Sequence, residues 1–266
     1  MLRPRRLSRV PPSFSVSVSQ RPFFVRQSVR FFGGMKVHSS HTAAWVNRHI
    51  QDEYVKRAQQ DQYRSRSAYK IMQMDDRYTV FRKNQVVVDL GCYPGGFSQV
   101  ALERCIPSQS GGKVIGIDRL KIDPLPGMVF LHTDVRKPDA TERLLRELGP
   151  RKADVVLSDL APKLIGVRQD DHLASAELCL HAADIAEKIL VADGSFVVKM
   201  FLGGQTQNYK VYLQSRFKKV HSCKPRASRE ESPEMFFVCK GFFGRAAFSE
   251  EVQVKSAFSH REGSPV

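Results

Sequence analysis

Acidic residues are missing from the first 51 residues of the chain, and lysine is missing from the first 34. The same 34 residues hold seven arginines, namely Arg3, Arg5, Arg6, Arg9, Arg21, Arg26 and Arg30. They contain no continuous apolar core, which excludes a secretory signal peptide. An arginine-rich, serine-rich, acid-free segment is typical of a mitochondrial transit peptide, whereas a basic RNA-binding arm would ordinarily mix in lysine. We therefore expect residues 1–34 to be a disordered transit peptide and the mature protein to lie in the mitochondrial matrix.

Paired cysteines and long apolar runs are also missing. The five cysteines include no Cys-x-x-Cys pair, which argues against a zinc site and against a disulfide framework. No apolar run approaches the roughly 18 residues that a membrane-spanning helix needs. We expect no bound metal, no membrane span and a monomer.

The charge of the chain is strongly unbalanced. Lys and Arg number 42 against 27 Asp and Glu, which gives a net charge of +15, and removal of residues 1–34 would leave +8. A surplus of this size favours a polyanionic partner, with nucleic acid ahead of an anionic membrane. The length of 266 residues and the 42% hydrophobic content indicate a globular domain with a substantial core.

Short β-branched segments alternate with helical ones after residue 85. The pattern predicts helices at 43–80, 97–104, 139–148 and 171–190, the last ended by Asp193-Gly194, and one more between 201 and 217. It predicts strands at 86–90, 114–118, 128–131, 154–160, 195–201, 217–223 and 234–242. This alternation is typical of an α/β fold with a mostly parallel sheet and helices on both faces. We divide the chain into the transit peptide, an N-terminal helical RNA-contacting segment (35–80), a main domain (81–245) and a mobile tail (246–266).

A glycine-rich loop follows the first predicted strand. It runs Asp89-Leu90-Gly91-Cys92-Tyr93-Pro94-Gly95-Gly96-Phe97 and leads into a helix, an arrangement that builds a nucleotide-type pocket. It does not match G-x-G-x-x-G and has no P-loop lysine, which weighs against dinucleotides and nucleoside triphosphates. The acid before the first glycine suits a cationic ligand such as S-adenosylmethionine. Phe97 could pack on the adenine of that ligand or simply belong to the core.

Two more acids follow the next two strands. Asp118 could accept hydrogen bonds from ribose hydroxyls and Asp134 from an adenine amino group. Either acid alone is more often a turn residue or a helix cap. Together with Asp89, at three successive strand ends, they favour a nucleoside-binding edge.

Two charged residues stand in apolar strands. Asp159 ends Leu157-Ser158-Asp159-Leu160, and Lys199 lies inside Val197-Val198-Lys199-Met200. Ammonium groups are seldom buried without a partner, although Lys199 could also reach solvent from a strand end. Because parallel strands end at one ligand-binding edge, we expect Asp159 and Lys199 to meet there.

Five motifs in order resemble the FtsJ/RrmJ family of ribosomal RNA 2′-O-methyltransferases over residues 60–242. They lie at residues 64–70, 88–99, 158–162, 197–199 and 224–234. The resemblance implies a Rossmann-like S-adenosylmethionine-dependent methyltransferase fold, with a seven-stranded sheet whose last strand is antiparallel. With the presequence, the chain would be a mitochondrial member of that family.

The resemblance also implies site residues and a reaction. The family's catalytic tetrad corresponds to Lys70, Asp159, Lys199 and Glu234. We expect Lys199 to be the base or the group that positions the hydroxyl, with the others supporting it. The expected contacts of S-adenosylmethionine are Asp89, Gly91, Pro94, Gly95, Gly96, Phe97, Asp118, Asp134 and Asp159. The expected substrate is a uridine ribose of mitochondrial large-subunit rRNA, in support of ribosome biogenesis. Cys92-Tyr93 and Lys163 depart from the family pattern, which has small residues and an asparagine there.

Basic residues near both ends of the main domain are candidate RNA contacts, or an ordinary solvated surface. They are Arg64, Arg66, Lys224, Arg226 and Arg229, with Lys218 and Lys219 close by. Three other functions stay open: an RNA-binding ribosome-assembly factor without catalysis, a methyltransferase acting on tRNA or an mRNA cap, and an NAD-linked dehydrogenase. The loop spacing and Lys199 count against the dehydrogenase.

Overall fold

The computed structural model describes residues 52–105 and 111–244. All of them belong to one compact unit. The predicted transit peptide and mobile tail lie outside the described residues. Within these ranges, none of the helices combines the length and the apolar character of a membrane-crossing segment.

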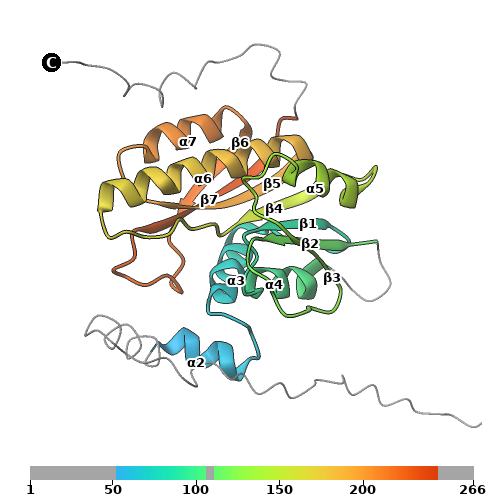
Figure 1. Ribbon diagram of the computed structural model, residues 1–266, viewed down its shortest axis with the longest axis horizontal. Coiled ribbons are helices and arrows are strands. Elements are labelled where there is room, and N and C mark those ends of the chain that lie inside the picture. Colours follow the sequence, from blue (N-terminus) through green and yellow to red (C-terminus); the bar gives the residue numbers. More distant parts are fainter. Residues whose placement is uncertain (1–51, 106–110, 245–266) are drawn as a thin grey trace, which may run out of the picture. The chain divides into compact units, whose positions relative to one another are not determined.

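The described strands form one seven-stranded sheet in the order β3-β2-β1-β4-β5-β7-β6 (Figure 1). The strands are β1 (Val86–Leu90), β2 (Lys113–Asp118), β3 (Met128–His132), β4 (Ala153–Ser158), β5 (Leu190–Phe201), β6 (Phe217–Cys223) and β7 (Glu234–Phe242). The pairs among β1 to β5 are parallel, and β7 runs antiparallel to both β5 and β6. This confirms the predicted fold class. Because β7 is reversed, its first residue Glu234 pairs with Phe201, the last residue of β5.

Helices cover both faces of the sheet. They are α2 (Glu53–Gln60), α3 (Ser67–Tyr78), α4 (Gly96–Cys105), α5 (Ala140–Leu148), α6 (Arg168–Ile189) and α7 (Thr206–Gln214). Alternate residues of a strand point to opposite faces. Accordingly, Val86 and Val88 belong to a core that includes side chains of α5, α6 and α7, whereas Val87 belongs to a second core that includes side chains of α3 and α4. A strand residue two positions from a member of the second core therefore faces α3 and α4.

Two predicted boundaries were wrong. The helical pattern at 43–80 is interrupted in its described part between α2 and α3, where Gln62 adopts a φ of 60°. Asp193-Gly194 does not end the long helix, because α6 stops at Ile189 and β5 begins at once with the buried Leu190. The Asp-Gly pair instead lies in β5, with Asp193 at a φ of 63°, where the register between β4 and β5 shifts.

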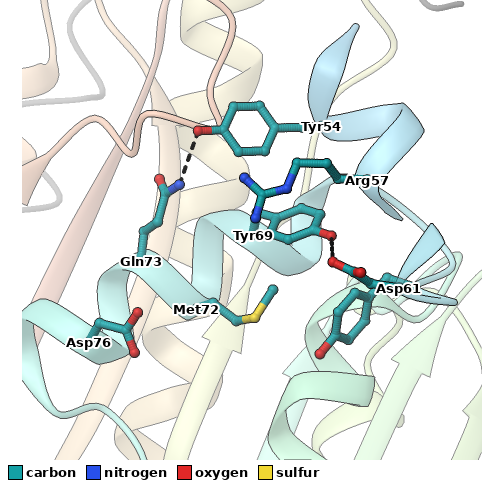
Figure 2. A pocket seen from close by; sticks show the side chains of 8 residues that line it. Tyr54, Arg57, Asp61, Tyr69, Met72, Gln73 and Asp76 are labelled. Atoms are coloured by element: carbon teal, nitrogen blue, oxygen red, sulfur yellow. Dashed lines mark hydrogen bonds between the residues drawn. The ribbon is translucent and has the colours of Figure 1, made fainter. Parts of the chain in front are cut away.

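An open pocket of about 400 Å³ lies between α2 and α3 (Figure 2). Its lining includes three tyrosines, Tyr54, Tyr63 and Tyr69. Gln73 Nε2 donates to the Tyr54 hydroxyl at 3.3 Å, and the Tyr69 hydroxyl donates to the Asp61 carboxylate. These polar groups satisfy one another, so the pocket forms a junction that docks α2 on α3.

The end of β5 is fixed by a buried histidine of α6. His172 Nδ1 lies 2.8 Å from the carbonyl oxygen of Phe201, and the backbone N–H of Gln205 donates to Nε2 at 2.9 Å. These partners assign the proton to Nδ1. Gly203 lies against the ring, because a Cβ added there would come within 2.2 Å of it. The hydrogen bonds of His172 hold in place the segment that follows β5, the strand that carries Lys199.

Gly203→Ala should lower the free energy of unfolding by about 1–3 kcal/mol, because the added methyl must displace a close-packed ring. The matched control is Gly204→Ala, since no heavy atom lies within 4 Å of a Cβ at that position. Thermal unfolding of the two variants checks this. Equal unfolding temperatures would contradict the packing described for His172.

Candidate active site

The glycine-rich loop after β1 is a close-packed structure. Gly91 has a φ of 78°, and a Cβ there would lie 2.6 Å from Leu160 Cδ2. A Cβ on Gly96 would lie 2.4 Å from Ser65 Oγ. Glycine is therefore required at position 91, where the loop packs against Leu160, and at position 96, where it packs against Ser65 in the segment before α3. Gly95, at a φ of 116°, lies against the side chain of Arg64.

Arg64 links this loop to the one that follows β2. Its Nη1 donates to the carbonyl oxygen of Asp123 at 2.7 Å and, more weakly, to that of Pro94 at 3.5 Å. Its Nη2 donates to the carbonyl oxygen of Pro124 at 2.8 Å. The sequence suggested an RNA contact or an ordinary solvated surface for Arg64, and the RNA contact stays a prediction. The structure gives its guanidinium a positioning role that the sequence did not indicate.

The three predicted carboxylates stand at the ends of β1, β2 and β3. Asp118 accepts hydrogen bonds from the backbone N–H groups of Tyr93 (2.9 Å) and Leu120 (2.8 Å). It therefore joins the loop after β1 to the loop after β2. Asp134 binds Arg136, whose Nη2 lies 2.7 Å from Oδ2. The hydrogen bond from Arg136 lowers the pKa of Asp134 to about 2. An adenine contact by Asp134 stays a prediction, and it would have to share the carboxylate with Arg136.

Asp89 lies deepest of the three. Its side chain is fully buried, Ser98 Oγ donates to Oδ2 at 2.6 Å, and Oδ1 has no partner among the described residues. Burial raises the pKa of Asp89 to about 7, although the hydrogen bond from Ser98 opposes the shift. The buried Thr133 Oγ1, just past β3, likewise has no described partner. An acceptor-rich, glycine-lined cradle with two such polar atoms fits a nucleoside ligand that carries positive charge, as S-adenosylmethionine does.

Two residues of the predicted cofactor loop are buried, and a cofactor contact by Phe97 stays a prediction. Phe97 is only 3% exposed and packs on Phe236 with ring centroids 6.2 Å apart, which is the core role left open by the sequence. Cys92 is also buried, and burial raises the pKa of its thiol. Tyr93, by contrast, is exposed and joined to Pro94 by a cis peptide bond.

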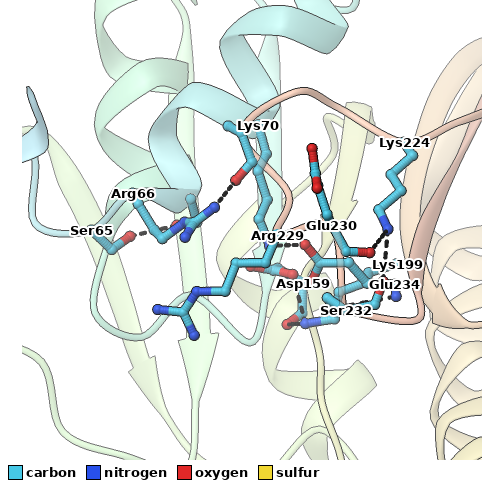
Figure 3. A network of polar contacts seen from close by, with 12 residues as sticks. Ser65, Arg66, Lys70, Asp159, Lys199, Lys224, Arg229, Glu230, Ser232 and Glu234 are labelled. Carbon is cyan, nitrogen blue, oxygen red and sulfur yellow. Dashed lines mark hydrogen bonds and ion pairs between the residues drawn. The ribbon is translucent and has the colours of Figure 1, made fainter. Parts of the chain in front are cut away.

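The four predicted catalytic residues meet in one network (Figure 3). Lys199 Nζ lies 2.7 Å from Asp159 Oδ1 and donates to the carbonyl oxygen of Asp159 at 3.0 Å. Lys70 Nζ lies 2.5 Å from Glu234 Oε1. Lys70, Lys199 and Glu234 are each no more than 8% exposed. Asp159 is half-buried, so the site holds two ion pairs of which three members are buried and one is partly exposed.

Strand parity explains why these residues meet. Lys199 stands two positions after Val197 and Glu234 two positions before Phe236, so both face the side of the sheet that α3 covers. Lys70 projects from α3 to that side, and Asp159 directly follows β4. Burial raises the pKa of Asp159, but the positive charges of Lys199 and Lys70 outweigh burial and hold that pKa below its usual range. The carboxylate therefore stays ionised and ties the two ion pairs together.

Three of the predicted RNA-contacting cations hold the segment before β7 in place. Arg66 pairs with Asp52 and donates to the carbonyl oxygen of Ala227. Arg229 Nε donates to the same Asp52 at 3.3 Å. Lys224 Nζ donates to two carbonyl oxygens of the same segment, at 2.8 and 2.9 Å (Figure 3).

These contacts limit what the cations offer to RNA. Asp52 was not singled out from the sequence, yet it anchors two of the arginines. Arg226 is exposed, as are Lys218 and Lys219 on β6, and Lys218 pairs with Asp193. RNA contact by all of these residues stays a prediction.

The described side chains form no group of three or more His, Cys, Asp or Glu that could hold a metal ion. The five cysteines are free thiols.

A Rossmann-like sheet, a glycine-lined loop and the network of Lys70, Asp159, Lys199 and Glu234 at the carboxyl edge are the features that the sequence analysis expects of a methyltransferase. The family model described as FtsJ-like methyltransferase matches residues 63–242. The chain is 42% identical over 200 residues to ribosomal RNA large subunit methyltransferase E of Brucella ovis, an alignment that covers 75% of this chain and 83% of the relative. The same values hold for the protein of that name from Brucella melitensis biotype 2.

A solved structure of a ribosomal RNA methyltransferase from Plasmodium falciparum is 40% identical, with a TM-score of 0.62. That match covers 69% of this chain and all of the other one. The chain belongs to the FtsJ-like methyltransferase family.

The buried Asp89 gives a pH dependence that can be measured. Its pKa in the folded state, about 7, lies above the ordinary value of 3.8, so the folded protein holds a proton that the unfolded chain releases. Stability from this group is complete below about pH 4 and is lost as the pH rises toward 7. Asp89→Asn removes that loss, so without added cofactor its stability relative to wild type should increase between pH 5 and 8. Urea unfolding across that range measures the difference, and a constant difference would contradict the assignment.

Proposed function

We propose that the protein transfers a methyl group from S-adenosylmethionine to a ribose 2′-hydroxyl of large-subunit ribosomal RNA. The observation that carries the proposal is the Lys199–Asp159 pair, in which the lysine side chain is 8% exposed and the carboxylate 20% exposed. Family membership supports methyl transfer. The names of the Brucella and Plasmodium relatives support ribosomal RNA as the substrate.

A ribose hydroxyl is a poor nucleophile, so the site has to align and polarise it. S-adenosylmethionine, when bound, supplies a methyl group on a positively charged sulfur. Asp89, Gly91, Asp118 and Asp159 would hold it at the carboxyl edge of the sheet. Alignment of an oxygen with the reacting carbon can supply several kcal/mol of rate enhancement, on the order of 10⁵ M or more in effective concentration.

We assign Lys199 the positioning role. Its Nζ lies 2.7 Å from Asp159 Oδ1 and donates to the carbonyl oxygen of Asp159 at 3.0 Å, so Asp159 holds the Lys199 side chain at the carboxyl edge of the sheet. An N–H of Lys199 would donate to the 2′-oxygen and stabilise the negative charge that develops there, while the hydroxyl passes its proton to water and the methyl group moves from sulfur to oxygen. Lys70 would act indirectly, because its charge helps to hold Asp159 ionised, and Glu234 would hold Lys70 in place through their ion pair.

We further propose that the substrate nucleotide is a uridine and that the protein works in the mitochondrial matrix during ribosome biogenesis. The acid-free, arginine-rich composition of residues 1–34 supports the location. The family resemblance of the five motifs supports the uridine. Mapping of 2′-O-methyl groups on mitochondrial RNA with and without the protein tests both statements.

Lys199→Ala should lower the methyl-transfer rate on a large-subunit rRNA transcript by about 10² to 10³, because a donor to the developing charge is lost. Affinity for S-adenosylmethionine should stay within about twofold of wild type, since the altered group contacts the acceptor oxygen. Lys188→Ala is the matched control, because Lys188 pairs only locally with Asp184 on α6. Radiolabelled methyl transfer and calorimetric cofactor binding give the two readouts.

Three outcomes would refute parts of the proposal. Loss of cofactor affinity in Lys199→Ala would place that lysine in cofactor binding instead. Preferential methylation of tRNA would overturn the rRNA assignment. RNA binding by the wild-type protein without methyl transfer to any RNA would favour an assembly factor.

A further inference from the structure

The exposed apolar side chains of the protein gather at the edge that carries the tetrad. Ten large apolar or aromatic residues are exposed in the described ranges. Six of them follow the carboxyl ends of parallel strands, namely Tyr93, Leu120, Leu164, Ile165, Val167 and Leu202. Exposed apolar residues that gather on one part of a protein mark a candidate contact site, whereas isolated ones need no explanation. The carboxyl edge of the sheet is therefore a candidate contact surface.

Half of these six residues stand on one loop. Leu164, Ile165 and Val167 are 59%, 64% and 50% exposed, and we call them the apolar lip. The loop begins directly after Asp159 and Leu160 and ends at α6. The lip therefore leaves the sheet at the same edge where Asp159 pairs with Lys199.

The lip is presented by an ordered backbone. Asp171, in the first turn of α6, accepts the N–H of Ile165 at 2.8 Å and the N–H of Gly166 at 3.1 Å. These bonds fix the loop while its apolar side chains remain in solvent. Exposed cations stand at both ends, Lys163 before the lip and Arg168 after it.

Burial of the tetrad indicates what the lip would contact. Lys70, Lys199 and Glu234 are at most 8% exposed, so the reacting ribose has to enter a recess. A strand that inserts one sugar cannot keep continuous stacking through that nucleotide, and the uncovered faces of its neighbours need apolar surface. The lip offers apolar side chains that can contact these bases, and the cations on either side of it can contact the neighbouring phosphates.

We propose that the apolar lip is a platform for RNA bases next to the reacting ribose, with Lys163 and Arg168 on the flanking phosphates. This inference rests on the proposed function. Aliphatic side chains read no hydrogen-bond pattern, so the lip adds affinity and register without selecting a base. Lys163, which departs from the family pattern, gains a role in it as a phosphate contact.

The test uses the full-length protein, S-adenosylmethionine and the large-subunit rRNA transcript that the wild type methylates. Ile165→Ser combined with Leu164→Ser should raise the KM for RNA about tenfold, while kcat at saturating RNA and cofactor affinity stay within about twofold. Ile165→Phe should keep or lower the KM, because an aromatic ring also stacks on bases. Val211→Ser, at a 55% exposed site on α7, is the matched control and should match wild type.

The salt dependence of RNA affinity distinguishes the apolar contacts of the lip from the phosphate contacts of Lys163 and Arg168. The slope of log affinity against log salt should be unchanged in the double serine variant. In Lys163→Ala it should fall by about one, as for one lost phosphate contact.

The outcomes against the proposal are distinct. An unchanged KM in the double variant, with an active wild type, would overturn the lip and leave the proposed function standing. A lower unfolding temperature in that variant would show that the lip is structural. A wild-type dimer that the double variant abolishes, with the RNA KM unchanged, would assign the lip to a second copy of the chain. If the wild type methylates no RNA, the proposed function itself fails.

Discussion

The structure depends on two ion pairs held almost out of water. Two lysines and two carboxylates at one edge of a sheet are tolerated only together, because removal of any one leaves an uncompensated buried charge. Asp159 is central, since it touches Lys199 and feels the charge of Lys70 as well. An arrangement of this kind contributes little to stability compared with apolar packing, so its presence is best explained by chemistry.

The rest of the fold serves this placement. Reversal of β7 brings Glu234 level with the end of β5, and strand parity turns Lys199 and Glu234 toward α3, which supplies Lys70. Segments before and after the sheet are then fastened around the site. Arg64 ties the glycine loop to the loop after β2, and Asp52 gathers Arg66 and Arg229 over the segment that leads to β7.

Local signals in the sequence predicted the sheet, the glycine cradle and the meeting of Asp159 with Lys199, whereas Lys70 and Glu234 were indicated only by the resemblance to the FtsJ/RrmJ family. Apolar runs such as Val86-Val87-Val88 mark strands, and an acid or lysine at the end of such a run is easy to recognise. The partners of Arg64 and Arg66 could not be predicted, because they are carbonyl groups and an acid brought close only by the folded chain. The place of Asp193-Gly194 could not be predicted either, because turn-forming residues fit an irregularity in a strand as well as the end of a helix. Phe97 was ambiguous because an apolar side chain suits both the core and a cofactor contact.

The central claim is that Lys199 and Asp159 form a coupled buried pair that the fold maintains for the reaction. A double-mutant cycle on the free energy of unfolding, with Lys199→Met, Asp159→Asn and the double variant, tests it most directly. Coupling predicts that the double variant is more stable than the sum of the single effects by about 1–3 kcal/mol. Effects that add to within about 0.5 kcal/mol would contradict it, because they would mean that the two side chains do not meet in the folded protein.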